Sequence, residues 1–269
     1  MRGKKAKQLR VDRTAEREAA RRKERQQTIF TAIVIAIVVA IGGVLVAVSL
    51  REPTPEELAA ASEGPSDGAS DPALENRPVA CGAEKPADAG TPKETFSEPE
   101  QVLEDGKDYQ AVIETSCGTI TADLYEGRAP ETVNSFVFLA QQGFFDGLEI
   151  FRNATSIGAL QTGAGTNEAS FKIGYTLPDE LEVAEEDGYP PGTLAMANAG
   201  PNTGGSQFFF VYNDKFTLEP QYAVFGKTSG KGLKTLGRLG EIPTVAPDDP
   251  SNETPSEVAY IESVKITTK

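Results

Sequence analysis

The residues whose types and spacing are most suited to binding or catalysis lie together in one stretch of the chain, Met196–Phe209. This stretch reads MANAGPNTGGSQFF. Amide side chains, glycines and a proline precede two aromatic rings in this stretch. Read alone, it predicts a strand, a long turn built from Gly, Pro and Asn, and a second strand that carries an amide and aromatic rings. On composition alone, an ordinary hairpin with a flexible loop is the favoured explanation.

Several classes of catalytic site are excluded because the 269-residue chain contains no histidine and only two cysteines. Without histidine there is no Ser-His-Asp or Cys-His nucleophile, no His-ligated zinc and no proximal-His haem. Two cysteines cannot form a four-cysteine zinc site or a self-contained iron–sulfur site. Cys117 is not a candidate nucleophile, because no histidine is available to activate it.

Charge is distributed unevenly along the chain, whose formal net charge is −14. Residues 1–28 carry a net charge of +7, residues 51–108 carry −10 and residues 109–269 carry −11. An acidic chain lacks the basic face that binding to a phosphate backbone requires, so we expect no nucleic-acid partner. The segregation of charge also predicts that the chain is not a single globule.

Residues 29–50 contain no charged side chain and consist almost entirely of Ile, Val, Ala, Leu and Gly. As a helix, this segment would span roughly 33 Å, enough for a hydrocarbon core of about 30 Å. The basic block in residues 1–28 precedes it, which orients the N-terminus to the cytoplasm. We predict a single-pass transmembrane helix that contacts membrane lipid, with everything after Leu50 outside the cytoplasm. A cleaved signal peptide is the main alternative, because Ala47-Val48-Ser49 is an acceptable small-residue cleavage site.

Residues 51–108 are rich in Pro, Glu, Asp, Ala, Ser and Gly and show no sustained apolar period. Eight prolines interrupt any helix or strand in this segment. Such a segment cannot bury enough apolar surface to offset the entropy of ordering it, so we predict an acidic, disordered linker.

Cys81 of this linker and Cys117 either form a disulfide, as an extracytoplasmic setting allows, or remain two unpaired thiols. The sequence favours neither alternative.

From residue 109 onward, apolar runs of strand length appear. Residues alternate in character over Tyr109–Thr115 and Thr119–Tyr125 around a Ser-Cys-Gly turn, which predicts a β-hairpin. A helix is predicted from Pro130, near its first turn, to Gly143, which stops it. Many short strands with two helices indicate a closed or nearly closed antiparallel barrel capped by helices. The remaining expected elements are strands over Thr193–Asn198, Gln207–Tyr212, Tyr222–Gly226 and Ala259–Thr267, and a helix over Gly232–Leu239.

Met196–Phe209 resembles the signature of cyclophilins, the barrel-fold peptidyl-prolyl isomerases, and departs from that pattern only at Gly204. The resemblance covers residues 109–269 and is to a membrane-anchored bacterial form. It implies a mainly β fold, a closed antiparallel eight-stranded β-barrel capped by two α-helices, preceded here by the transmembrane helix and the disordered linker. Supporting segments follow in the expected order: Ala129–Phe136 as the first helix, Phe145–Leu148 as the entry to the catalytic strand, Gln161, and Tyr222–Gly226.

The chemistry implied by this resemblance is rotation about Xaa-Pro peptide bonds, with no cofactor and no metal. The barrier of about 18–20 kcal/mol reflects the partial double-bond character of the C–N bond. A catalyst holds the proline ring in an apolar pocket, grips the preceding backbone and donates a hydrogen bond that favours a pyramidal prolyl nitrogen. A guanidinium suits the donor role because it is planar and always charged.

The resemblance assigns that guanidinium to Arg152, as the catalytic residue. The family's distance, counted forward from Asp146-Gly147, gives Arg152. Counted back from Gln161 it gives Asn153 instead, because this chain has one extra residue between these two anchors. We choose Arg152, since asparagine cannot supply a charged donor and the extra residue fits a loop around Ser156–Gly158. The residues implied to hold the substrate backbone or to wall the proline pocket are Gln161, Ala197, Asn198, Gln207, Phe209, Leu218 and Tyr222.

Several departures from the family pattern concern the proline pocket. Phe151 replaces the usual histidine before the arginine, and Tyr222 replaces a histidine found in many members. Gln161–Ala164 lacks the expected Gly-Gly-Asp, and Thr217 stands near the family's frequent tryptophan. We therefore expect an intact backbone-binding half and a remodelled proline pocket. The candidates for the usual Phe and Met positions of that pocket are Ile157, Ala159 and Leu160.

The sequence therefore predicts a peptidyl-prolyl cis-trans isomerase in the cell membrane, whose partners are proline-containing polypeptides that fold outside the cytoplasm. The alternative, from a different class, is a catalytically weak cyclophilin-like peptide-binding or chaperone module at the membrane. A purely structural envelope component is a third hypothesis. Catalysed exchange between cis and trans Xaa-Pro peptides separates the enzyme from the other two.

Overall fold

Alternating buried residues build the first two strands of the structure, a computed structural model that describes residues 76–269. In β1 (Tyr109–Thr115) every second residue is buried, and β2 (Gly118–Leu124) buries alternate residues in its second half. The two strands pair antiparallel, with Ile113 opposite Ile120. The predicted hairpin is confirmed, because side chains alternate between the two faces of a strand and one face of each strand is apolar.

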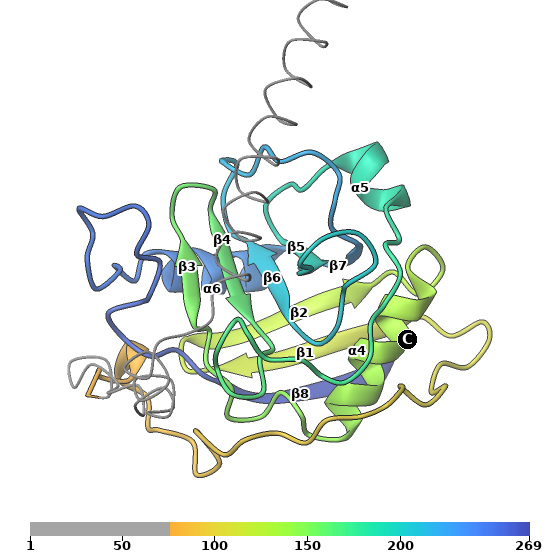
Figure 1. Ribbon diagram of the computed structural model, residues 1–269, viewed down its shortest axis with the longest axis horizontal. Helices are drawn as coiled ribbons and strands as arrows, with labels where there is room; N and C mark the ends of the chain where they lie inside the picture. Colours follow the sequence, from red (N-terminus) through yellow and green to blue (C-terminus); the bar gives the residue numbers. More distant parts are fainter. Residues whose placement is uncertain (1–75) are drawn as a thin grey trace, which may run out of the picture. The chain divides into compact units, whose positions relative to one another are not determined.

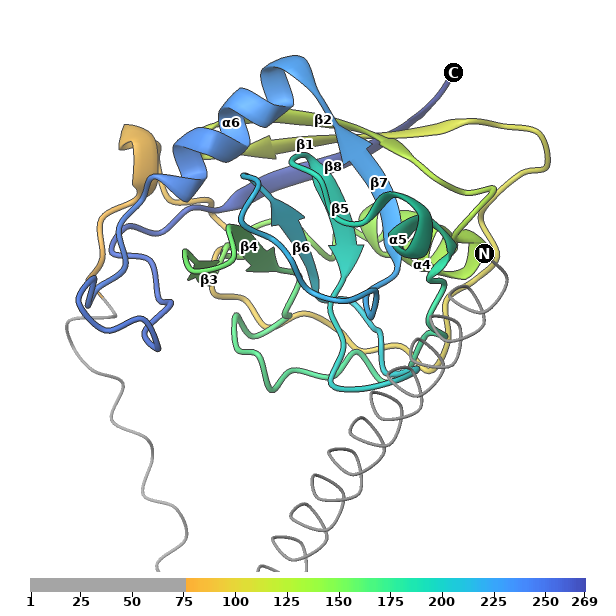
Figure 2. The same ribbon diagram turned by 90° about the horizontal axis from the view of Figure 1, so that it is seen from above.

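Six further strands extend this hairpin into one curled antiparallel sheet (Figures 1 and 2). Hydrogen-bonded neighbours follow the order β3-β4-β6-β5-β7-β2-β1-β8. The four further predicted strands are confirmed, with ends that shift by at most two residues. Residue alternation predicts neither β3 nor β4, because runs this short carry no clear period, although the family resemblance implies a catalytic strand after Phe145–Leu148. The six strands are β3 (Arg152–Ala154), β4 (Ala159–Thr162), β5 (Thr193–Met196), β6 (Phe208–Val211), β7 (Val224–Thr228) and β8 (Ile261–Thr268).

The two ends of the sheet meet through a short contact that lies mostly outside β3 and β8. Ile150 N donates to the Ala259 carbonyl at 2.8 Å, and Ile261 N donates to the Leu148 carbonyl at 2.8 Å. These bonds close the curl over a few residues, whereas β3 and β8 do not pair along their length. The expected eight-stranded closed barrel is therefore an eight-stranded curled sheet with a local closure.

Two predicted helices lie against the sheet, and one short helix is additional. α4 (Pro130–Gln141) begins with proline, which has no N–H group. Proline is tolerated there because the N–H groups of a first helical turn have no acceptor within the helix. α4 packs against β8. α6 (Gly230–Gly240) lies along β2 (Figure 2). The additional helix is α5 (Glu182–Asp187), and a 3₁₀ turn, η1 (Ala80–Gly82), precedes the first strand.

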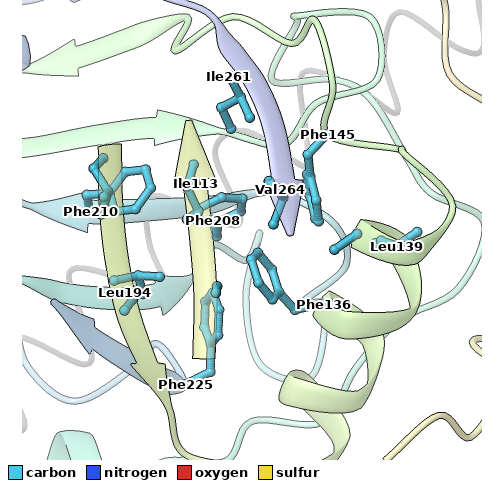
Figure 3. Packing of buried hydrophobic residues seen from close by; sticks show 14 of the residues in the cluster. Ile113, Phe136, Leu139, Phe145, Leu194, Phe208, Phe210, Phe225, Ile261 and Val264 are labelled. Carbon is cyan, nitrogen blue, oxygen red and sulfur yellow. The ribbon is translucent and has the colours of Figure 1, made fainter. Parts of the chain in front are cut away.

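The main core lies between the sheet and these helices and is dominated by phenylalanine rings (Figure 3). The Phe136 ring of α4 lies 5.1 Å from Phe145, 5.4 Å from Phe208 and 5.1 Å from Phe225, measured between ring centroids. Offset and edge-on contacts of this kind add to the stabilisation from buried area. The cluster links α4 to β6 and β7 and so holds the helix on the sheet.

Both faces of β5 and β6 are buried, unlike those of β1 and β2. Phe208 and Phe210 belong to the main core, whereas Phe209 and Val211 belong to a second cluster on the opposite face of the sheet. Because side chains alternate along a strand, three consecutive phenylalanines supply two different faces. The second cluster forms the base of the candidate site.

The prediction of a disordered linker is wrong for residues 76–108, which we call the strap. The strap runs past α4 to β1 (Figure 1). The Asn134 side chain of α4 donates to the Glu100 carbonyl at 2.9 Å, and the Phe96 and Phe138 rings meet edge-on with centroids 5.1 Å apart. Composition failed here because the order of the strap comes from partners on the domain, which lie far from it in sequence.

A disulfide between Cys81 and Cys117 joins the strap to the β1–β2 turn, so the paired alternative is the one observed. Arg77 adds an ion pair with Glu149 at 3.0 Å and a hydrogen bond to the Pro255 carbonyl at 2.9 Å. The packed unit therefore begins before residue 109, the boundary that composition predicts.

Helices of a length and hydropathy suited to crossing a membrane are absent from residues 76–269. The predicted cytoplasmic segment 1–28, the predicted transmembrane helix 29–50 and residues 51–75 of the predicted linker lie outside the described residues.

Removing the disulfide tests how much the cross-link contributes to stability. We expect the double variant Cys81→Ala/Cys117→Ala to lose about 4 kcal/mol of unfolding free energy, because a cross-link across 36 positions restricts the unfolded chain. Urea unfolding of the full chain in mild detergent, followed by circular dichroism, measures the difference. A loss below about 1 kcal/mol would show that the noncovalent contacts of the strap are sufficient.

Candidate active site

A pocket of about 450 Å³ opens on the face of the sheet that points away from the main core. All residues predicted for the site contribute to its lining, while the role of each stays a prediction. They are Arg152, Gln161, Ala197, Asn198, Gln207, Phe209, Leu218 and Tyr222.

Strand pairing places the central residues of this pocket side by side. Arg152 of β3 lies opposite Gln161 of β4, and Gln161 lies opposite Phe209 of β6. Because residues in register share a face, the guanidinium, the amide and the ring lie on the same side of the sheet. Gln207 stands two positions before Phe209 and lies on that side as well. Strand backbone, with its ladder of hydrogen bonds, therefore positions this set.

Three side chains form a directional chain of hydrogen bonds along the polar edge of the pocket. Arg152 Nη1 donates to Gln161 Oε1 at 2.8 Å, and Gln161 Nε2 donates to Gln207 Oε1 at 2.9 Å. Gln207 Nε2 donates to the carbonyls of Ala169 and Phe171 at 3.0 and 3.1 Å. Each amide is held in one orientation, since its oxygen and its nitrogen have different partners.

Arg152, and not Asn153, reaches the pocket. The Arg152 side chain is 41% exposed, and its Nε contacts the Glu253 carboxylate. Asn153 is fully buried, where it donates to the Ile242 carbonyl at 2.9 Å and accepts from Tyr212 Oη at 3.2 Å. The geometry favours Arg152 as a donor to a ligand, because a buried amide with satisfied partners cannot reach one.

The floor of the pocket is aromatic. Phe209 stacks on Phe216 with ring centroids 5.3 Å apart and an interplanar angle of 16°, and it meets Tyr222 edge-on at 5.3 Å and 89°. Phe209 and Phe216 are buried, and Leu218 lies exposed at the rim. A small apolar ring entering this floor would lose contact with water, which is favourable by roughly 25 cal/mol per Å².

Tyr189 lies behind the floor and holds the segment that carries Tyr222. Its hydroxyl accepts from the N–H groups of Gln221 and Tyr222, each at 2.9 Å, and donates to the Tyr222 carbonyl at 3.2 Å. Its ring contacts Phe216, with centroids 4.8 Å apart. Burial raises the pKa of the Tyr189 phenol, against a smaller lowering by the backbone hydrogen bonds. The phenol therefore keeps its proton, and with it its donor role.

Ala197 and Asn198 lie just after the end of β5. Ala197 N donates to the Gln207 carbonyl at 2.9 Å. Asn198 Nδ2 donates to the Gln221 carbonyl at 2.7 Å, and its Oδ1 accepts from Gly200 N at 3.3 Å. The Asn198 side chain thus ties the long turn to the segment before β7. Its contact with a substrate backbone stays a prediction.

The turn between β3 and β4 lies where the sequence analysis expects the extra residue. Residues 155–158 form this turn, and Gly158 has a φ of +69°, a left-handed conformation that favours glycine. Ile157 and Ala159 line the pocket, whereas Leu160 belongs to the main core. Ile157 and Ala159 therefore lie where they can occupy the pocket positions that the family fills with Phe and Met, and Leu160 does not.

The other departures from the cyclophilin pattern have different surroundings. Phe151 is half-buried and Thr217 is exposed, and neither is part of the pocket lining. Thr162 is buried, and its hydroxyl donates to a backbone carbonyl at 2.8 Å. Among these positions Tyr222 lines the pocket, so the predicted remodelling of the proline pocket rests on it.

Two residues of the site carry no signal in the sequence. Phe216 stacks on Phe209, but polar and charged neighbours surround it in the chain. Glu253 contacts Arg152 from a loop that lies 101 positions further along, a separation that no local motif spans. Residues between 169 and 176 form an additional wall of the pocket, which the sequence does not indicate either.

The chemistry that this arrangement offers is recognition and hydrogen bonding. Within residues 76–269, no group of three or more His, Cys, Asp or Glu side chains is placed to hold a metal ion. The pocket combines a planar cation at its edge, amides with fixed orientations and an aromatic floor. Such a site can bind an extended peptide with a small apolar ring and donate a directed hydrogen bond to it.

Known proteins of one family resemble this chain in sequence. The family model for "Cyclophilin type peptidyl-prolyl cis-trans isomerase/CLD" matches residues 110–266. The "Probable peptidyl-prolyl cis-trans isomerase B" of Mycobacterium tuberculosis is 43% identical over 139 residues, which cover 47% of this chain and 45% of that protein. Its counterpart in Mycobacterium leprae is 39% identical over 170 residues, 58% of this chain and 56% of that protein. The chain thus spans about half the length of these mycobacterial relatives.

A shorter relative and a solved structure agree with this match. The peptidyl-prolyl cis-trans isomerase of Synechococcus elongatus is 40% identical over 134 residues, which cover 48% of this chain and 88% of that protein. A crystal structure of a Cryptosporidium parvum cyclophilin type peptidyl-prolyl cis-trans isomerase, in the presence of the dipeptide ala-pro, superposes with a TM-score of 0.52 at 26% identity. The superposition covers 60% of this chain and 99% of that one. The chain therefore belongs to the cyclophilin-type peptidyl-prolyl cis-trans isomerase family.

Proposed function

We propose that this chain catalyses the cis-trans isomerisation of Xaa-Pro peptide bonds. The observation that carries the proposal is the position of the Arg152 guanidinium, which is half-exposed at the edge of the aromatic pocket and is held by Gln161. Membership of the cyclophilin family and relatives named for this activity support it. The reaction needs neither cofactor nor nucleophile, because no covalent bond is made or broken.

The barrier to the reaction is the resonance of the amide, about 18–20 kcal/mol. Resonance is lost as the prolyl nitrogen becomes pyramidal, and its lone pair then accepts a hydrogen bond. A fixed, charged donor lowers the barrier because it interacts more strongly with this twisted state than with the planar amide. Arg152 fits the role, since its guanidinium is planar, charged and already held by hydrogen bonds.

The other residues of the lining divide into two functional groups in this proposal. Phe209, Phe216 and Tyr222 receive the proline ring, because the floor that they form is apolar. Gln161 and Asn198 bind the backbone of the substrate, and Gln207, whose amide nitrogen already donates to two carbonyls, holds Gln161 in its orientation. Holding the ring and the preceding backbone together brings the prolyl nitrogen to the donor. The Cryptosporidium parvum relative, solved in the presence of ala-pro, supports proline-containing peptides as the substrate class.

The proposal extends to the location of the protein. The basic segment 1–28, the uncharged apolar stretch 29–50 and the disulfide of the strap support a single-pass membrane protein whose isomerase domain lies outside the cytoplasm. Disulfides form and persist in oxidising compartments, which agrees with this orientation. The substrates would then be polypeptides that fold after export.

A second candidate function is peptide binding or chaperone action without appreciable catalysis. The observation that favours it is Tyr222, which lines the floor where many cyclophilins carry a histidine. The two functions differ in one assay. The enzyme accelerates exchange between the cis and trans forms of an Xaa-Pro peptide, whereas the binding module retains the peptide without accelerating exchange.

Substituting Arg152 by alanine tests the proposed donor. We expect kcat/KM to fall by roughly 30- to 1,000-fold, or about 2–4 kcal/mol of barrier lowering, as for the loss of an oxyanion-type donor. Exchange NMR of Xaa-Pro peptides with the full chain in mild detergent measures the rate. Arg152→Lys should recover little activity, because an ammonium lacks the planar fork of the guanidinium.

Asn153→Ala is the matched control for this experiment. It removes buried hydrogen bonds and should lower the unfolding free energy by about 1–3 kcal/mol. The kcat/KM of the folded protein should stay within about twofold of wild type. The assignment of the donor is wrong if Asn153→Ala abolishes catalysis and Arg152→Ala does not.

The pH dependence of catalysis should be flat near neutrality, because the chain has no histidine. Burial raises the pKa of the phenols of Tyr189 and Tyr175, so both stay protonated further into the alkaline range than a free tyrosine. We expect kcat/KM to vary by less than about twofold between roughly pH 6 and pH 9. A bell-shaped profile centred near pH 7 would reveal a proton-transferring group that the site as described lacks.

The orientation in the membrane is tested with alkaline phosphatase fused after Lys269 of the full chain. We expect an active fusion in bacterial cells, because this reporter needs disulfides and folds only outside the cytoplasm. Mass spectrometry of the membrane fraction should find residues 1–28 still attached. An inactive fusion contradicts the orientation, and a mature protein that begins near residue 50 would instead identify a cleaved signal peptide.

A further inference from the structure

We propose that Glu253 is a positioning residue for Arg152, an inference that rests on the proposed isomerase function. Glu253 belongs to the loop between α6 and β8, and its carboxylate contacts Arg152 Nε. The two residues lie 101 positions apart, so no local sequence motif contains both. The Glu253 side chain is 22% exposed, so the contact is partly shielded from water.

The backbone around Glu253 holds the carboxylate in place. The Glu253 carbonyl accepts from Asn153 N at 2.7 Å, which fastens the loop to β3 next to Arg152. Val245 N donates to the Thr254 carbonyl at 2.9 Å, so the two arms of the loop are joined close to Glu253. A carboxylate anchored in this way can fix its partner, whereas one on an unattached loop would follow the motion of the arginine.

Two anchors define the plane of the guanidinium. Glu253 holds Nε, and Gln161 Oε1 accepts from Nη1 at 2.8 Å. Among residues 76–269 no hydrogen-bond acceptor engages Nη2, which leaves this atom to donate to a ligand in the pocket. Because a guanidinium is rigid and planar, fixing two of its nitrogens also fixes the direction in which the third one donates.

The carboxylate has a second, opposing effect on catalysis. Its negative charge offsets part of the positive charge that stabilises the twisted amide. Screening by water weakens this effect, because the Arg152 side chain is 41% exposed. Alignment of the donor is the stricter requirement, since a shift of about 1 Å can reduce a rate by about 100-fold. Positioning is therefore the larger effect, and loss of Glu253 should slow the reaction.

The kinetic test compares Glu253→Ala with Glu253→Gln in the full chain. We expect Glu253→Ala to lower kcat about fivefold and to leave KM within about twofold, because the donor is misaligned while the binding surfaces remain. Glu253→Gln should keep at least about half of wild-type kcat, since its amide oxygen still accepts from Nε. Equal or higher kcat in Glu253→Ala overturns the proposal, as does a Glu253→Gln variant as slow as Glu253→Ala.

Two further variants separate positioning from general effects of charge and stability. Asp248→Ala removes the same charge from an exposed position of the same loop and should leave kcat unchanged. In an Arg152→Ala background, Glu253→Ala should cause no further loss, because it acts through the arginine. A further loss of the same size in that background overturns the proposal. Thermal midpoints show at which temperature all variants are folded for the comparison.

A measurement without turnover tests the contact itself. In ¹⁵N NMR spectra of the full chain, the Arg152 Nε–H signal should exchange slowly with water in wild type and in Asp248→Ala, and should lose this protection in Glu253→Ala. Unchanged protection in Glu253→Ala overturns the proposal. A wild-type chain with a protected signal and no isomerase activity overturns the proposed function and the positioning role together. An active wild type whose Glu253→Ala variant is equally fast overturns the positioning role alone.

Discussion

The alternation of Phe208, Phe209 and Phe210 along β6 is the constraint on which the rest of the structure depends. The outer two rings fill the main core, and the ring between them forms the floor of the pocket. A shift of one residue in the pairing of β6 would exchange these two sets and leave the core and the floor both incomplete. The burial of both faces therefore specifies the register strongly. Core packing and site geometry are set in the same step, because one strand supplies both.

The same register extends from the floor to the cation at the edge of the pocket. β6 pairs with β4 and β4 pairs with β3, which brings Phe209, Gln161 and Arg152 into one row. A chain without histidine has no imidazole to transfer protons near neutral pH. In the proposed reaction, the site works instead with a permanent cation and oriented amides, whose effect depends on being held before the substrate arrives. The hydrogen bonds from Arg152 to Gln161 and from Gln161 to Gln207 hold these side chains in place, and Gln207 in turn donates to the Phe171 carbonyl in the pocket wall.

The strap shows how a segment of disordered composition becomes part of the folded unit. Lys93 N donates to the Gly165 carbonyl at 3.1 Å, and Phe96 N donates to the Ile173 carbonyl at 2.8 Å. Gly165 lies just before the pocket wall and Ile173 belongs to it, so the strap and the wall support each other. Local composition measures what a segment can bury by itself. Composition does not record the partners that the rest of the domain presents, such as the Cys117 thiol, the Asn134 amide and the Phe138 ring.

The sequence by itself determined the elements with a clear period and the motif of the site. The β1–β2 hairpin follows from alternation, and α4 from the proline at its start and the glycine after its end. The choice of Arg152 follows from the family resemblance, through its distance from Asp146-Gly147 and the charge that asparagine lacks. Tertiary structure alone decided the short strands β3 and β4, the stacking of Phe216 and the contact of Glu253 with Arg152. The physical reason is the separation along the chain between the residues that interact. Periodicity records which face of a local element is buried, whereas these features depend on partners far apart in the chain that meet only when the sheet has curled.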